Sequence, residues 1–152
     1  MVRIDILFKT DSSKLPQVAE PYKLDLIVVF GSYAKGKAQP DDLDIAVRTT
    51  REEFARLSSG EGLWEWELSL LADLDRIIDL PYDIDLVLLN RVFDSTLLFE
   101  IARYGIPIYE KEPTTFHHFR SYAARRFDDD AKFRRLGWEY LKRWCSDDKS
   151  AL

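Results

Sequence analysis

Residues 26–47 read LIVVFGSYAKGKAQPDDLDIAV, and this stretch decides how the chain folds. Its first five residues are β-branched or apolar, a run typical of a buried strand and too short to cross a membrane. Gly31 and Ser32 follow directly, and a Pro-Asp turn leads to a second apolar segment, DLDIAV, at 42–47. We therefore expect two strands joined by a glycine-containing connection, with a brief helix beginning near Ser32.

The second strand carries two carboxylates, Asp42 and Asp44. Side chains alternate along a strand, so both carboxylates would project from one face while Leu43, Ile45 and Val47 pack on the other. Neighbouring carboxylates repel each other, and a hard cation such as Mg²⁺ is the commonest reason for a fold to hold them together. The pattern predicts a magnesium site.

The turn between the strands has the features of an anion site. A strand that ends in Gly-Ser and leads into a helix directs backbone N–H groups and a hydroxyl toward a bound anion. A metal on Asp42 and Asp44 would bridge to that anion, so a triphosphate is the expected ligand. Lys35 or Lys37 would add positive charge, with a solvated loop position as the alternative for both.

These residues together resemble the nucleotidyltransferase superfamily that includes DNA polymerase β. The match is carried by Gly31, Ser32, Ala34, Gly36, Asp42 and Asp44. Within the superfamily the chain looks most like the minimal nucleotidyltransferases, small prokaryotic proteins paired with HEPN-domain partners in toxin–antitoxin modules. The resemblance covers roughly residues 24–112. One position departs from it, because Asp41 stands where serine is common, and we interpret Asp41 as a solvated turn residue.

The resemblance implies an α/β (α+β) fold in which helices flank a small mixed sheet. It implies a catalytic domain over residues 1–113 and a C-terminal helical extension over 114–152, which packs on that domain and is available to a partner. The local patterns indicate strands at 3–8, 81–89 and 106–110, the last at a sheet edge because of its proline. Helices are expected near 16–20, at 51–57, at 63–78 and at 95–104.

The resemblance also implies a third carboxylate on the strand near residue 85, completing a site for two Mg²⁺ ions. Asp83 and Asp85 share one strand face, and Asp85, which precedes Leu86 and Val87, fits better. The implied metal-binding and catalytic residues are Asp42, Asp44 and Asp85. The implied nucleotide-binding residues are Gly31, Ser32, Lys35 and Gly36.

The activity that follows from the resemblance is transfer of AMP from ATP to a hydroxyl, expected to be a tyrosine, of a HEPN-domain toxin. Two alternatives come from other classes. An antitoxin that acts by binding alone would need no complete acidic triad. An adenylyltransferase of a small molecule such as an aminoglycoside would usually need an additional C-terminal domain with an acidic pocket.

Composition narrows the class of protein. With 152 residues, 46% hydrophobic and 32% charged, the chain has the make-up of one globular domain. It has no apolar stretch of membrane-spanning length and no signal-peptide pattern at its N-terminus, and its single cysteine, Cys145, cannot form an internal disulfide. These features favour the cytoplasm. The net charge of −5 argues against general nucleic-acid binding.

The aromatic residues and charges are unevenly distributed. Residues 114–143 carry eight Arg or Lys against four Asp or Glu, a net +4 that leaves −9 for the rest of the chain. This segment is expected to be helical with a break at 128–130, and either contacts an acidic partner or presents a solvated face. We expect at least half of its aromatic side chains to pack on the sheet. We also expect Trp64 to lie in the core.

Overall fold

The computed structural model describes residues 10–150, and side chains through residue 147. The strand expected at 3–8 lies outside the described residues. The remaining strands form one mixed sheet in the order β3-β2-β1-β4. Their bounds are β1 Leu24–Phe30, β2 Asp42–Thr49, β3 Asp83–Leu88 and β4 Ile106–Glu110.

Strand directions confirm the mixed sheet expected from the sequence. β1 runs antiparallel to both β2 and β4, whereas β2 and β3 are parallel. β4 lies at an edge, as Pro107 requires, because a proline has no N–H to donate to a second neighbour. The parallel pair needs a long crossover, and the chain supplies it with the helices between β2 and β3.

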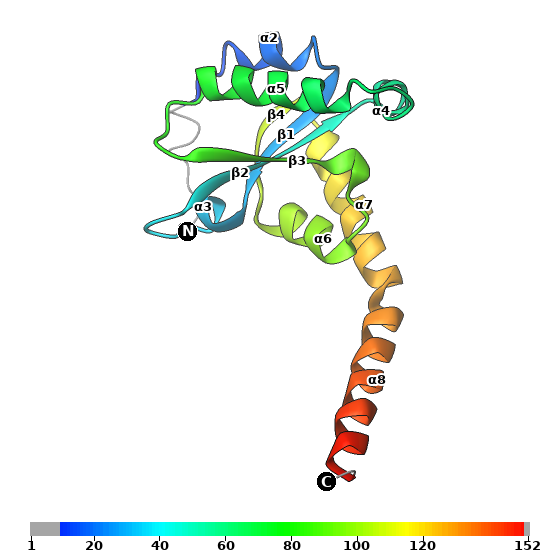
Figure 1. Cartoon of the computed structure of the whole chain (residues 1–152). Coiled ribbons are helices and arrows are strands. Elements are labelled where there is room, and N and C mark those ends of the chain that lie inside the picture. The colour runs from blue at the N-terminus through cyan, green and yellow to red at the C-terminus, as the bar shows by residue number, and fades with distance from the viewer. Residues whose placement is uncertain (1–9, 151–152) are drawn as a thin grey trace.

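Helices cover both faces of the sheet (Figure 1). α2 (Leu15–Ala19) and α5 (Leu63–Ile77) lie over one face, while α6 (Ser95–Tyr104) and α7 (Thr115–Asp129) lie over the other. The short α3 (Gly31–Ala34) follows β1, α4 (Arg51–Ser58) follows β2, and a 3-10 turn, η1 (Leu89–Arg91), follows β3.

Alternation along β2 divides the core as expected. Leu43, Ile45 and Val47 are buried in the cluster that includes α2 and α5. Ala46 is buried in the opposite cluster, which α6 and α7 complete. Asp42 and Asp44 share the parity of Ala46, so their side chains lie on the α6 side of the sheet.

The helix boundaries follow from local capping. The Thr50 hydroxyl accepts a hydrogen bond from Glu53 N at 3.2 Å and begins α4. The Asp94 carboxylate accepts from Thr96 N at 2.9 Å and begins α6 at the place that the Asp-Ser-Thr sequence predicts.

The prediction that Trp64 lies in the core is wrong. Trp64 is 67% exposed and Leu68 is 46% exposed, whereas Leu70 and Leu74 are fully buried. α5 carries two apolar stripes, and the stripe through Trp66, Leu70 and Leu74 faces the sheet. The Trp66 ring lies edge-on to Tyr22, with 5.6 Å between ring centroids. Periodicity alone did not decide which of the two stripes is buried.

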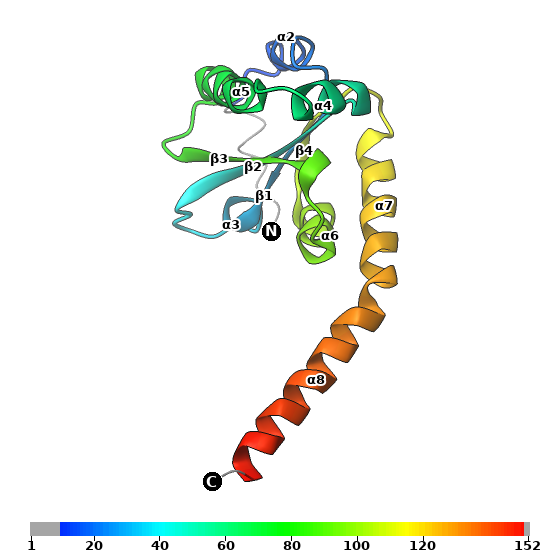
Figure 2. The ribbon, with the colours of Figure 1, turned by 45° about the vertical axis from the view of Figure 1, so that its right-hand side comes forward.

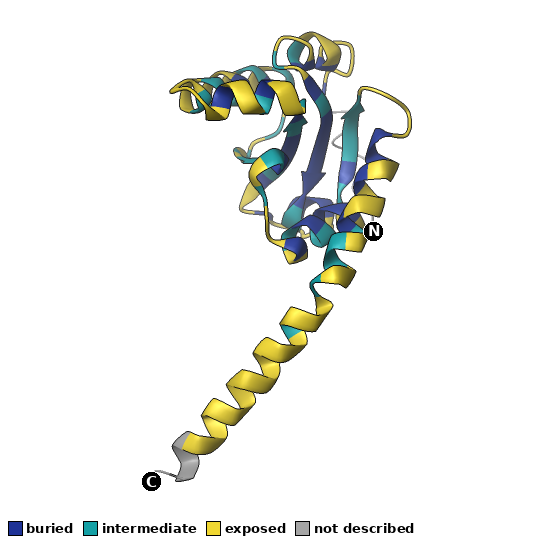
Figure 3. Cartoon of the chain, turned by 90° about the vertical axis from the view of Figure 1, so that its right-hand side faces the viewer, coloured by how far each residue is buried: buried dark blue, intermediate teal, exposed yellow. Residues whose placement is uncertain are grey.

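The C-terminal segment folds into two helices separated at Asp130, α7 and α8 (Ala131–Ser150). Phe116, Phe119 and Ala123 of α7 are buried against the sheet and α6. α8 extends away from the sheet (Figure 2), and its residues 131–147 are exposed apart from the half-buried Arg134 (Figure 3). The expectation that at least half of the segment's aromatic residues pack on the sheet is therefore wrong. The domain boundary at 113/114 stays a prediction.

Within the described residues, no helix combines the length and the apolar character needed to span a bilayer.

The two stripes of α5 can be tested by matched substitutions. We expect Trp66→Ala to lower the free energy of unfolding by about 3 kcal/mol, because it leaves a cavity beside Tyr22. Trp64→Ala should change it by less than about 0.5 kcal/mol, because Trp64 is exposed. Urea denaturation of both variants would measure the difference, and equal losses would contradict the observed orientation of α5.

Candidate active site

The predicted site residues meet where β1 ends, where β2 begins and where β3 runs beside it. Phe30, the last residue of β1, is the register partner of Asp44. On the other side of β2, Asp44 is the register partner of Asp85. Since register partners in adjacent strands point to the same face, Asp42, Asp44 and Asp85 project together toward the α6 side of the sheet.

Gly31 is held directly against Asp44. Its φ is +73°, in the left-handed region that favours glycine. A Cβ at this position would lie 2.0 Å from Asp44 Oδ2, so any side chain would collide with the carboxylate. The sequence of the turn therefore brings the start of α3 into contact with the predicted metal ligand.

The rest of the turn is short and hydrogen-bonded to itself. Gly36 ends α3 with a φ of +81°, and its N–H donates to the Tyr33 carbonyl at 3.0 Å. Lys37 N donates to the Ser32 carbonyl at 3.0 Å. These bonds fold residues 31–37 into a compact loop beside the carboxylates, with Ser32 next to Gly31.

The charge on Asp44 is unfavourable in this site. Burial raises the pKa of the Asp44 carboxyl, and the negative charges of Asp85, Asp42 and Glu100 raise it further, in that order. In the described part of the chain, no Lys, Arg or His forms an ion pair with Asp42, Asp44 or Asp85. A bound cation would relieve this repulsion.

Lys35 lies at the site but is engaged by α6. Its ammonium forms an ion pair with the Glu100 carboxylate and lies 4.8 Å from the centre of the Tyr104 ring. The sequence predicted Lys35 as a residue of the site but did not predict Glu100. No local pattern could have found Glu100, because only the packing of α6 on the sheet brings it close to Asp44.

The two candidates for the third carboxylate face different surroundings. Asp85 is among the charges that raise the pKa of Asp44, whereas Asp83 is not. Asp83 lines a groove with residues of α5. This geometry favours Asp85, and its role stays a prediction. Asp41 is exposed and 3.5 Å from the Lys37 ammonium, as expected for a solvated turn residue.

The acidic residues suit magnesium by their chemistry. Carboxylate oxygens are the ligands that Mg²⁺ prefers, and three of them project from one face of two adjacent strands. Within residues 10–147, no three His, Cys, Asp or Glu side chains are close enough to form a metal site. The Asp42, Asp44 and Asp85 carboxylates would therefore have to converge when the ion binds.

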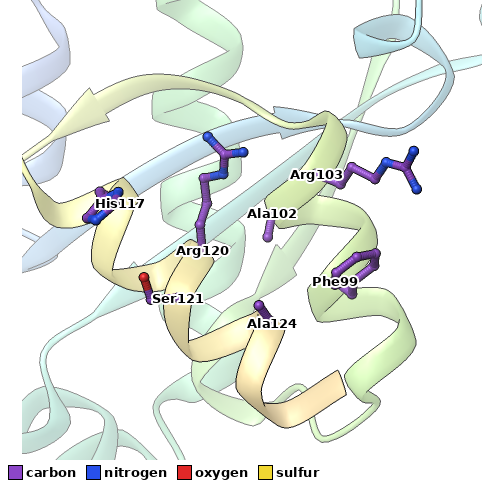
Figure 4. A pocket seen from close by; sticks show the side chains of 7 residues that line it. All are labelled: Phe99, Ala102, Arg103, His117, Arg120, Ser121 and Ala124. Carbon is purple, nitrogen blue, oxygen red and sulfur yellow. The ribbon is translucent and has the colours of Figure 1, made fainter. Parts of the chain in front are cut away.

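A separate hollow of about 550 Å³ lies between α6 and α7 (Figure 4). None of the predicted site residues lines it. Small side chains form its floor, and its basic residues include Arg103 and Arg120. The two guanidinium groups point in different directions, so they do not form a single anion site (Figure 4).

Comparison with known families identifies the class of protein. Residues 13–114 match the family described as "Polymerase beta, Nucleotidyltransferase". The chain belongs to this family, and the nucleotidyltransferase class expected from the sequence is confirmed. No curated protein matches the chain.

Solved structures share the fold. One belongs to a toxin–antitoxin complex with AMP-PNP, with 23% identity, 86% of this chain and 98% of that chain covered, and a TM-score of 0.58. A second is a variant of the toxin–antitoxin complex MntA–HpeT. The two chains are 22% identical, the match covers 86% of this chain and 98% of that chain, and the TM-score is 0.58.

A third structure is a tri-AMPylated Shewanella oneidensis HEPN toxin in complex with MNT antitoxin. Its match has 23% identity, 86% of this chain and 95% of that chain covered, and a TM-score of 0.54. At these identities the likeness shows a common fold. The expected resemblance to the minimal nucleotidyltransferases is confirmed at that level.

The electrostatics of the site predict the effect of one substitution on stability. A raised carboxyl pKa means that the folded chain binds the proton more tightly than the unfolded chain does. Stability is therefore lost as the pH rises from the ordinary value of 3.8 through the raised pKa. Without divalent cations at pH 7, Asp44→Asn should raise Tm by about 2–4 °C.

Thermal denaturation in the presence of EDTA would measure this gain. Asp41→Asn serves as the control, because Asp41 is exposed and outside the repelling cluster. A Tm for Asp44→Asn at or below that of the unmodified chain would contradict the predicted repulsion.

Proposed function

We propose that this chain transfers AMP from ATP to a tyrosine hydroxyl of a HEPN-domain toxin and thereby acts as its antitoxin. The observation that carries the proposal is the contact between Gly31 and Asp44. It places a glycine-serine turn against a carboxylate cluster in a chain of the nucleotidyltransferase family. The AMPylated toxin in one complex of the same fold supports protein as the acceptor, and AMP-PNP in another supports ATP as the donor.

Each residue of the site has a role in this proposal. The Gly31 N–H and the Ser32 hydroxyl donate hydrogen bonds to the terminal phosphates of ATP. Asp42, Asp44 and Asp85 hold the magnesium ions. When bound, Mg²⁺ neutralises phosphate charge and lowers the pKa of the attacking hydroxyl. Lys35 and Gly36 complete the phosphate-binding loop.

The transfer itself is an in-line displacement. The tyrosine oxygen forms a bond to the α-phosphorus of ATP, the bond from that phosphorus to the bridging oxygen breaks, and pyrophosphate leaves. Asp85 accepts the hydroxyl proton. Burial and then the negative charges of Asp85, Asp42 and Glu100 raise the pKa of Asp44, and a bound cation would stabilise its ionised form.

The acceptor site would be supplied by the toxin. The region that matches the family, residues 13–114, contains the four strands of the sheet in the described residues and the carboxylate site. The toxin and this chain would therefore form a hetero-oligomer during transfer. We place the reaction in the cytoplasm, which agrees with the single cysteine of the chain.

The activity can be tested by intact mass spectrometry of a candidate HEPN partner incubated with this chain, ATP and Mg²⁺. We expect the toxin to gain one or more AMP units. Asp44→Asn should slow the gain at least about 100-fold, since even changes behind a metal ligand cost 10–100-fold. Asp41→Asn should leave it unchanged, because Asp41 lies in the solvated turn.

The same experiment separates catalysis from simple binding. A toxin that is blocked in a stable complex without any gain in mass would contradict the proposal and favour an antitoxin that acts by binding. Equal transfer by the Asp44→Asn variant would contradict the assignment of the carboxylates.

Metal binding can be measured without the reaction. We expect MgCl₂ to raise the Tm of the unmodified chain by about 2–4 °C, because a ligand that binds only the folded state stabilises it. The increase should be lost in Asp44→Asn and kept in Asp41→Asn. A similar response in both variants would place magnesium somewhere other than the carboxylate cluster.

A further inference from the structure

α8 carries an apolar stripe that nothing in the described chain covers. The stripe, hereafter the α8 stripe, consists of apolar side chains on one side of the helix, spaced three or four residues apart except for the adjacent pair Tyr140 and Leu141. Its members and their exposed fractions are Phe133 68%, Leu136 49%, Tyr140 69%, Leu141 51% and Trp144 63%. Figure 3 shows α8 exposed over residues 131–147, apart from the half-buried Arg134.

This exposed area is large for a solvated helix. Three of the five members are aromatic, and an aromatic side chain buries about 150–250 Å² when it is covered. The stripe thus offers several hundred Å², the size at which apolar patches mark interaction sites. Between residues 131 and 147 every α8 side chain except that of Arg134 is exposed, so α8 lacks the packing of an amphipathic face that usually stabilises a helix. The exposed apolar area and the lack of packing on α8 both indicate that this helix binds another surface.

Gly137 adds a notch to the stripe. It lies one turn after Phe133 and one turn before Leu141, in the middle of a helix that glycine destabilises. A Cβ at Gly137 would have no atom within 4 Å, so nothing inside the chain requires a glycine. A side chain inserted from another molecule would require one.

The charges beside the stripe restrict the occupant. At 3.6 residues per turn, Lys132, Arg134 and Arg143 lie beside the stripe and Asp147 at its edge, whereas Arg135 and Lys142 lie on the opposite side of α8. Two α8 helices packed on each other would bring like charges together, which disfavours that arrangement. An apolar groove with acidic residues at its rim is the complementary surface.

The same chain presents such a groove on the far side of the sheet. Leu68, Leu71 and Ala72 of α5 and Ile84 of β3 line it, with Asp75 and Asp83 at its edge. We call it the α5 groove. Exposed Trp64 continues the same helix face. This helix face includes Trp64, which the sequence predicted to lie in the core.

A chain cannot bring α8 to its own α5 groove with the helices as they stand. α5 covers one face of the sheet, whereas α7 packs with α6 on the other and α8 continues away from the sheet (Figures 1 and 2). The junction is fixed, because the Arg134 guanidinium stacks 3.7 Å from the Phe127 ring and donates to the Phe127 carbonyl at 2.7 Å. Phe127 in turn stacks on Phe99 of α6 at 4.2 Å.

We propose that two copies of this chain exchange their C-terminal helices, the α8 stripe of each packing into the α5 groove of the other. A helix of this length spans about 30 Å, enough to cross to a second molecule. The basic residues that flank the α8 stripe would then lie near Asp75 and Asp83. A large exposed side chain such as Trp64 would enter the notch at Gly137.

The first test is the mass of the purified full-length chain in solution, measured by light scattering over a concentration series. We expect twice the 17.8 kDa of one chain, and a weaker dimer at high salt because the contact is charge-complementary. A chain that stays monomeric throughout would overturn the proposal, as would a dimer that salt strengthens.

Variants at exposed positions test which surfaces meet. Tyr140→Asp in the α8 stripe and Leu68→Arg in the α5 groove should each weaken the dimer about tenfold or more. Trp138→Asp is the matched control: Trp138 is 67% exposed but lies on another side of α8, and the dimer should persist. Circular dichroism checks that all three remain folded.

Mixing the two disruptive variants tests the exchange itself. The Leu68→Arg chain keeps an intact α8, and the Tyr140→Asp chain keeps an intact groove, so the mixture should form a dimer with one good contact. If the mixture stays monomeric, or if Trp138→Asp disrupts as strongly as Tyr140→Asp, the proposal fails.

Gly137→Ala independently tests whether position 137 contacts the second molecule. Without a partner, alanine would only strengthen α8. In the exchanged dimer it should weaken association, because it fills the notch. Unchanged association together with greater helicity would overturn the assignment.

Discussion

The candidate site depends on the close approach of Gly31 to the carboxylate of Asp44. The approach is possible because position 31 has no side chain and adopts a positive φ. Because of this approach, the chain turns sharply at the end of β1. α3 therefore begins beside β2. The phosphate-binding loop and the carboxylates are therefore parts of one turn-and-strand unit, and neither can shift without the other.

The sequence correctly predicted the features that depend on residues close together along the chain. Alternation along 42–47 predicted which side chains share a face, and Pro107 predicted an edge strand; both are confirmed. The Asp-Ser-Thr capping signal correctly predicted the start of α6. Each of these depends on neighbours along the chain or on the period of a single element, which a sequence displays directly.

Features that depend on which surfaces meet were not predictable in the same way. α5 has apolar residues on two sides, so its periodicity fits either orientation, and the sheet decides in favour of Trp66 over Trp64. Glu100 reaches the vicinity of Asp44 through helix packing across 56 positions of sequence. The exposure of α8 depends on the direction in which α7 leaves the sheet, and no residue pattern records that direction.

The parallel pairing of β2 with β3 also limits where the chain can change in length. Asp44 and Asp85 share a face only while their strands keep the present register. One inserted residue between Asp42 and Asp44, or within β3, would rotate a carboxylate to the opposite side of the sheet. The long crossover between the strands has no such constraint, since it needs only to return the chain to the correct edge. Insertions and deletions should therefore be tolerated around residues 59–62 and excluded from the strands that present the acids.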